Sequence, residues 1–84
     1  MSQKIRLLRA SCRRIAQDVA EAHQIPFDEL LSCRRAPARI RQEAYWRCAT
    51  ETYASYVQIG IVFDRHWTTV IHGVRAHMRR VAHV

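Results

Sequence analysis

Hydrophobic positions along most of this 84-residue chain recur every three or four residues, which is the spacing of one buried helix face. The last such stripe begins after Asp64 and continues to about Ala82. A short apolar pattern from Tyr56 to Val62 precedes it, with a tight connection between the two. This order predicts two consecutive helices, as in a helix-turn-helix. The positions predicted on the buried face of the last helix are Trp67, Val70, Ile71, Val74, Met78 and Val81.

The same spacing predicts three earlier helices. The first covers residues 3–23, and Pro26 both disfavours its continuation and suits the first turn of a short second helix over residues 26–32. Pro37 likewise precedes a third helix that ends at about residues 53–54. The predicted apolar faces consist of Ile5, Leu8, Cys12, Ile15, Val19 and Ala22, then Phe27, Leu30 and Leu31, then Ile40, Ala44, Tyr45, Cys48, Ala49 and Thr52.

Local signals near the C-terminal half support this assignment. Ser55, followed three residues later by Gln58, matches a capping box and predicts the start of the fourth helix. Gly60 and Gly73 fall inside helical patterns, where Gly costs about 1 kcal/mol against Ala, so we expect close helix packing at both. The sequence therefore predicts an all-α fold, a compact bundle of about five helices ending in a helix-turn-helix.

The charge balance points to an anionic partner. Fourteen Lys and Arg against seven Asp and Glu give a formal net charge of +7, and nucleic acid is the commonest partner of so basic a domain. The alternative is a solvated basic surface without a partner. The length corresponds to one domain over residues 1–84. Basic residues cluster at the start of the first predicted helix, where the helix dipole favours acidic ones. Residues 1–13 are therefore expected to be an extension prone to fraying.

The cysteines do not form a disulfide or zinc pattern. Cys12, Cys33 and Cys48 are an odd number without a CxxC pair, which indicates reduced thiols in a cytoplasmic protein. Cys12 and Cys48 fall on apolar stripes and are predicted to lie in the core. No segment has the length of a membrane span or the pattern of a signal peptide.

Candidate catalytic and metal-binding patterns are also missing from the sequence. The histidines lack the i, i+4 spacing of a helical zinc site, and no glycine-rich loop suggests a phosphate cradle. No carboxylate pair is placed for acid–base work. We therefore expect no enzyme activity, no metal, no cofactor, no small-molecule substrate and no membrane partner. The histidines in question are His66, His72, His77 and His83.

A series of short motifs between residues 14 and 80 points to one family. They are Val19-Ala20-Glu21 with Ile25, Asp28-Glu29-Leu30-Leu31-Ser32 with Arg34-Arg35, Arg39, Arg41-Gln42 and Ala44, then Ser55, Ile59-Gly60, Phe63, Arg65, Thr68-Thr69-Val70-Ile71-His72 and Arg75. In this order they resemble the C-terminal DNA-binding domain, domain IV, of the bacterial replication initiator DnaA. The resemblance implies an all-α helix-turn-helix domain with a basic loop before the third helix. We expect it here as a domain standing alone, without the initiator's ATPase domain.

The resemblance also implies how the domain contacts DNA. By position, Arg35 of the basic loop enters the minor groove, and the start of the last helix reads bases in the major groove. Matching positions elsewhere contact the phosphate backbone. The predicted minor-groove and loop residues are Arg34 and Arg35, the base-reading residues are His66, Trp67 and Thr68, and the other contacts come from Arg39, Arg41, Gln42, Arg65 and Thr69.

Two positions depart from the family, which usually has Asp and then His where this chain has His66 and Trp67. Asp accepts a hydrogen bond from cytosine, whereas His and Trp offer donors and an apolar surface. Trp67 could instead belong to the core, and Thr68 and Thr69 could simply cap the helix.

We predict a non-enzymatic protein that binds double-stranded DNA in the cytoplasm, associated with the nucleoid, in the regulation of replication initiation or transcription. The alternative is a protein-interaction module that docks on the replication initiator or another partner and has lost sequence-specific DNA binding. Its surface would include Trp67, Tyr45, Trp46 or the first helix.

Overall fold

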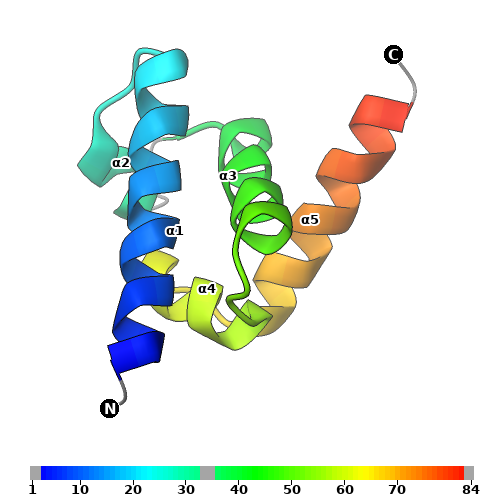
Figure 1. The fold of residues 1–84 in the computed structure, drawn as a ribbon. Coiled ribbons are helices and arrows are strands. Elements are labelled where there is room, and N and C mark those ends of the chain that lie inside the picture. The colour runs from blue at the N-terminus through cyan, green and yellow to red at the C-terminus, as the bar shows by residue number, and fades with distance from the viewer. Residues whose placement is uncertain (1–2, 33–35, 83–84) are drawn as a thin grey trace.

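The computed structural model describes residues 3–32 and 36–82, and within them it contains helices and no strand (Figure 1). The predicted all-α fold ending in a helix-turn-helix is confirmed. No helix in these two ranges combines the length and the apolar character needed to cross a membrane. The helices are α1 (Gln3–Ala22), α2 (Phe27–Ser32), α3 (Ala38–Glu51), α4 (Tyr56–Phe63) and α5 (Trp67–Ala82).

The core lies between α1, α2, α3, α4 and the first half of α5, and Tyr45 of α3 is its largest fully buried side chain. The ring of Tyr45 meets the ring of Phe63 edge to face, with centroids 5.0 Å apart, a favoured geometry for aromatic pairs. In α1 the buried face includes Ala16 and Ala20. Ala22, which was predicted on this face, is exposed because the helix ends there. The largest fully buried side chains are Tyr45, Phe63, Leu30, Ile59, Val19 and Val70.

Helix α5 approaches α3 closely because Gly73 has no side chain. A Cβ atom at Gly73 would lie 2.6 Å from Cδ2 of Tyr45, which is closer than Cβ atoms in proteins approach such a neighbour. Since Tyr45 is buried, its ring has no free space to move into. The prediction of close packing at Gly73 is confirmed.

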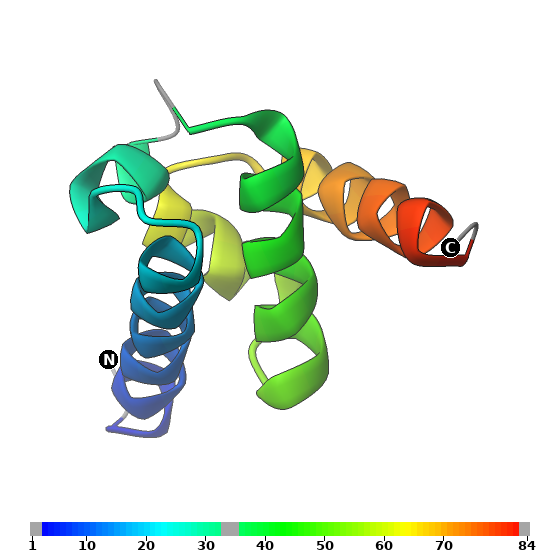
Figure 2. The ribbon, with the colours of Figure 1, turned by 90° about the horizontal axis from the view of Figure 1, so that it is seen from above.

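The apolar stripe predicted for α5 is only partly buried. Its first half packs into the core, but Trp67, Met78 and Val81 are 44%, 54% and 53% exposed, so the prediction was wrong for these three. The face turned toward α3 carries Gly73 and His77 instead. The last turns of α5 also extend away from the other helices, so no helix of the described residues covers Met78 and Val81 (Figure 2).

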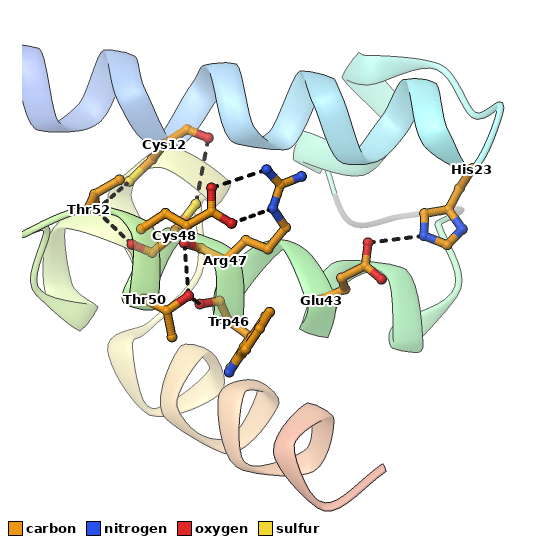
Figure 3. Close-up of polar contacts among 9 residues, drawn as sticks. Cys12, His23, Glu43, Trp46, Arg47, Cys48, Thr50 and Thr52 are labelled. Carbon is orange, nitrogen blue, oxygen red and sulfur yellow. Dashed lines mark hydrogen bonds and ion pairs between the residues drawn. The ribbon is translucent and has the colours of Figure 1, made fainter. Parts of the chain in front are cut away.

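Polar contacts and two thiols join α1 to α3 (Figure 3). Cys12 and Cys48 are free and buried, as predicted, and the Cys48 thiol donates to the Cys12 carbonyl oxygen at 3.6 Å. The contact with the Cys12 side chain and burial together raise the pKa of the Cys48 thiol. At the other end of the interface, His23 Nε2 lies 3.1 Å from Glu43 Oε2.

The ends of two helices are fixed by local hydrogen bonds. Helix α1 ends at Ala22, Gln24 two residues later has a left-handed φ of 58°, and the Ile25 amide donates to the Ala20 carbonyl at 3.0 Å. Helix α4 starts with the predicted capping box, in which Ser55 and Gln58 each bind the other's backbone amide.

Candidate nucleic-acid interface

The turn between α4 and α5 is built from Asp64 and a close backbone contact. Asp64 has a left-handed φ of 53°, a conformation that Asp tolerates better than most residues. The Arg65 amide then donates to the Gly60 carbonyl at 2.8 Å, and the Asp64 amide donates to the Ile61 carbonyl at 3.3 Å. A Cβ atom at Gly60 would overlap the carbonyl oxygen of Arg65. The turn therefore needs glycine at Gly60, but the close neighbour is the backbone of the turn and not the packed helix that the sequence predicted.

The side chain of Arg65 links this turn to the end of α2. Its Nη2 donates to the Ser32 carbonyl at 3.3 Å, and the residue is exposed. Asp28, Glu29 and Asp64 line the same surface hollow as Arg65. These carboxylates lower the positive potential around the guanidinium, so they would weaken its attraction for a phosphate group.

The basic loop begins directly after Ser32. Arg34 and Arg35 lie outside the described residues, so their predicted contacts with DNA stay predictions. In the view of Figure 2, the described segment that enters α3, the turn after α4 and the start of α5 lie toward the same side of the molecule, at different heights in Figure 1.

The N-terminus of α5 is capped by His66 rather than by a threonine. The Thr68 amide donates to His66 Nδ1 at 3.2 Å, and Thr68 Oγ1 lies 2.8 Å from the same nitrogen. The Thr69 amide donates to the His66 carbonyl at 3.0 Å. His66 and Thr69 are exposed and Thr68 is half-buried, so all three side chains lie at the open end of the helix. The capping role of His66 was missed because imidazole is not among the usual N-cap side chains.

Trp67 lies on the surface beside His66. Its ring is tilted by 34° to the imidazole, with centroids 5.6 Å apart, and the residue is 44% exposed. The alternative that Trp67 is a core residue is therefore wrong. An indole in this place offers an apolar face and one N–H donor to whatever meets the start of α5.

The predicted contacts on α3 differ in how they are held. Arg39 is exposed, whereas Arg41 is half-buried and donates from Nη1 to the Ala36 carbonyl. Gln42 accepts a 2.7 Å hydrogen bond at Oε1 from Nη2 of Arg80. Arg80 was not among the predicted residues. The sequence carries no signal for it, because only the packing of α5 on α3 brings it to Gln42.

The surface proposed for protein docking is smaller than predicted. Tyr45 is only 2% exposed, so it has no access to a partner. Trp46 is half-buried against His77, with ring centroids 4.9 Å apart. A shallow apolar hollow of about 250 Å³ lies beside this pair, lined by Trp46, His77, Met78, Val81 and Ala82. Within residues 3–32 and 36–82, no cluster of His, Cys, Asp or Glu has the makings of a metal site.

Comparison with known proteins adds two matches. A family model described as the bacterial DnaA protein helix-turn-helix matches residues 12–76, which include α4, the turn and the first half of α5. The chromosomal replication initiator protein DnaA of Dechloromonas aromatica (strain RCB) is 44% identical over 64 residues. That match covers 73% of this chain but only 14% of the initiator's length. No solved structure matches the chain with significance.

Proposed function

The chain belongs to the bacterial DnaA helix-turn-helix family, and we propose that it binds double-stranded DNA without catalysing a reaction. The observation that carries the proposal is the exposed start of α5, where His66, Trp67 and Thr68 follow Arg65 directly. A helix-turn-helix places the N-terminal residues of its second helix against base edges in the major groove. The net charge of +7 supports an anionic partner of this kind.

The phosphate contacts would come from both sides of that helix start. Arg65 and Thr69 flank the base-reading residues, and Arg41 and Gln42 lie on α3. Because Arg80 occupies Oε1 of Gln42, the amide NH₂ group remains to donate to a phosphate oxygen. We keep Arg35, with Arg34 beside it, as the proposed minor-groove contact on the strength of sequence alone.

A role in the regulation of replication initiation or of transcription, in the cytoplasm at the nucleoid, follows as the finer proposal. It is supported by the name of the relative, a chromosomal replication initiator protein. The rival function is docking on the initiator or another protein. The exposed Trp67 would then contact a protein surface, and sequence-specific binding of duplex DNA would be lost.

The test measures duplex binding by fluorescence anisotropy across a series of salt concentrations, on random duplexes and on duplexes with the initiator's binding box. If five to seven phosphates are neutralised, as we estimate roughly from the residues above, log K should fall with log salt at a slope of about −0.9 per contact. Tighter binding to the box than to random duplexes would support sequence reading. A flat salt response, or no binding at low salt, would favour the protein-docking function.

A matched pair of variants separates a local contact from bulk charge. Arg65→Ala removes a charge at the turn, and Arg6→Ala removes one from an exposed position in the first turns of α1, which lie on the opposite side from that turn in Figure 2. Arg65→Ala should lower the magnitude of the salt slope by about 1 and weaken binding to all sequences alike. Arg6→Ala should change the slope far less. Equal effects of the two variants would contradict the proposed orientation.

A further inference from the structure

The hydrogen bonds of His66 fix which of its two ring nitrogens faces the helix. Nδ1 lies 3.2 Å from the Thr68 backbone nitrogen and 2.8 Å from Thr68 Oγ1. A backbone N–H can only donate, so Nδ1 must hold a free electron pair in order to accept from it. The amide of Thr68 is one of the donors that a helix N-terminus leaves without an intrahelical partner, so its bond to Nδ1 stabilises the start of α5.

The proton of the neutral imidazole therefore resides on Nε2. With the proton on Nδ1 instead, two N–H groups would face each other at the start of α5, and the Thr68 amide would lose its partner. A flipped ring would place a C–H group against that amide, with the same loss. The Thr68 hydroxyl completes the arrangement by donating to Nδ1, so its own oxygen keeps its accepting capacity.

The outward-facing atom of His66 is thus a hydrogen-bond donor. Nε2 is separated from Nδ1 by one ring carbon, so with Nδ1 against the Thr68 amide the Nε2–H bond points away from that amide, and the residue is exposed. The Trp67 ring, 5.6 Å away and tilted by 34°, restricts the space into which the imidazole can turn. The side chain of this exposed residue is therefore held by its cap through Nδ1 and has the indole of Trp67 beside it.

We propose that His66 is a specificity-determining residue that selects guanine at one position of the bound duplex and discriminates most against cytosine. This inference rests on the proposed binding of the start of α5 in the major groove. There guanine presents two acceptors, N7 and O6, whereas cytosine presents the N4 amino donor. An Nε2–H group pairs with the first and opposes the second. Adenine and thymine, which each present one acceptor, fall between them.

The decisive experiment is base selection from a randomised duplex library by the wild type, His66→Asn and His66→Asp. Asn and Asp are both strong N-caps, so each variant should keep the start of α5. With one oxygen capping the helix, Asn leaves an amino donor outward and Asp leaves an acceptor. The wild type and His66→Asn should select guanine at the same position, and His66→Asp should select cytosine there, with other positions unchanged. A single hydrogen bond corresponds to a preference of about three- to tenfold.

A direct measurement of the tautomer tests the premise without DNA. The ¹⁵N chemical shifts of the His66 ring in the free protein should report a protonated Nε2 and an unprotonated Nδ1. Protonated Nδ1 in the neutral ring would overturn the inference. Melting curves of both variants, expected to resemble the wild type, confirm that the helix start is intact.

The outcomes of the selection separate two failures. If the wild type and both variants bind duplexes but prefer the same base at every position, His66 reads no base and only this inference is overturned. If the wild type binds no duplex even at low salt, the proposed function fails and this inference fails with it.

Discussion

Replacing Gly60 by alanine should destabilise the fold, although the same change usually stabilises a helix. Alanine in a helix interior is favoured over glycine by about 1 kcal/mol. At Gly60 the added methyl group would overlap the carbonyl oxygen of Arg65, which is backbone and cannot turn away as a side chain would. The Arg65 peptide must therefore move.

The size of the effect follows from what holds that peptide. Overpacking of this kind costs about 1 to 3 kcal/mol. The movement also weakens the two turn hydrogen bonds, from the Arg65 amide to Gly60 and from the Asp64 amide to Ile61, at about 0.5 to 1.5 kcal/mol each. After subtracting the helix preference of alanine, the free energy of unfolding should fall by about 1 to 5 kcal/mol. In a domain of this size, each kcal/mol lowers Tm by about 4 to 8 °C.

Thermal and urea unfolding followed by circular dichroism measure this change. Gln17→Ala, at an exposed site of α1, is the matched control and should shift the free energy of unfolding by no more than about 0.5 kcal/mol. DNA affinity of folded Gly60→Ala should also fall, because the displaced carbonyl belongs to Arg65. A Gly60→Ala protein that melts at or above the wild-type temperature would refute the packing argument.

Three further predictions concern the cap, the thiols and the basic loop. Ser55→Ala removes the capping box of α4 and should lower the free energy of unfolding by about 1 kcal/mol in urea titrations, with DNA affinity of the folded protein retained; an unchanged midpoint would contradict it. In a Cys33→Ser background, a thiol reagent should label Cys12 and Cys48 only as fast as the protein unfolds, because both are buried, and rapid labelling of the folded protein would show that the thiols are accessible. Because the pKa of Cys48 is raised in the folded protein, the free energy of unfolding should decline above about pH 8.5, where unfolded thiols ionise. Arg35→Ala should weaken duplex binding by about 1 to 3 kcal/mol, most on A·T-rich flanks, and equal affinity by anisotropy would leave the loop charge merely solvated.

The helix boundaries were predictable because local chemistry sets them. Pro26 and Pro37 restrict the residues before them, and Ser55 satisfies the amides of the next helix, so each mark acts within a few residues. The left-handed residues Gln24 and Asp64 were not predictable, because most side chains in their place avoid that conformation. Only the surrounding helix packing makes it favourable.

The burial of residues on α5 and the side-chain contacts of the candidate DNA interface were harder to predict, because they depend on how the helices pack against one another. Met78 and Val81 continue the apolar period, but no helix within residues 3–32 and 36–82 reaches far enough to cover them. The partners of Gln42 and Arg65 come from distant parts of the chain, and their pairing requires the packed structure. The predicted DNA contacts themselves remain predictions.

The anchoring of Arg65 has a thermodynamic consequence for partner binding. Its backbone is packed on Gly60 and its guanidinium binds the Ser32 carbonyl, so the described side of the contact surface is already ordered in the free protein. Association with this side then requires no coupled folding and loses little conformational entropy. The heat-capacity change should therefore reflect only the surface buried, and the association rate should be set by diffusion and charge rather than by a slow ordering step.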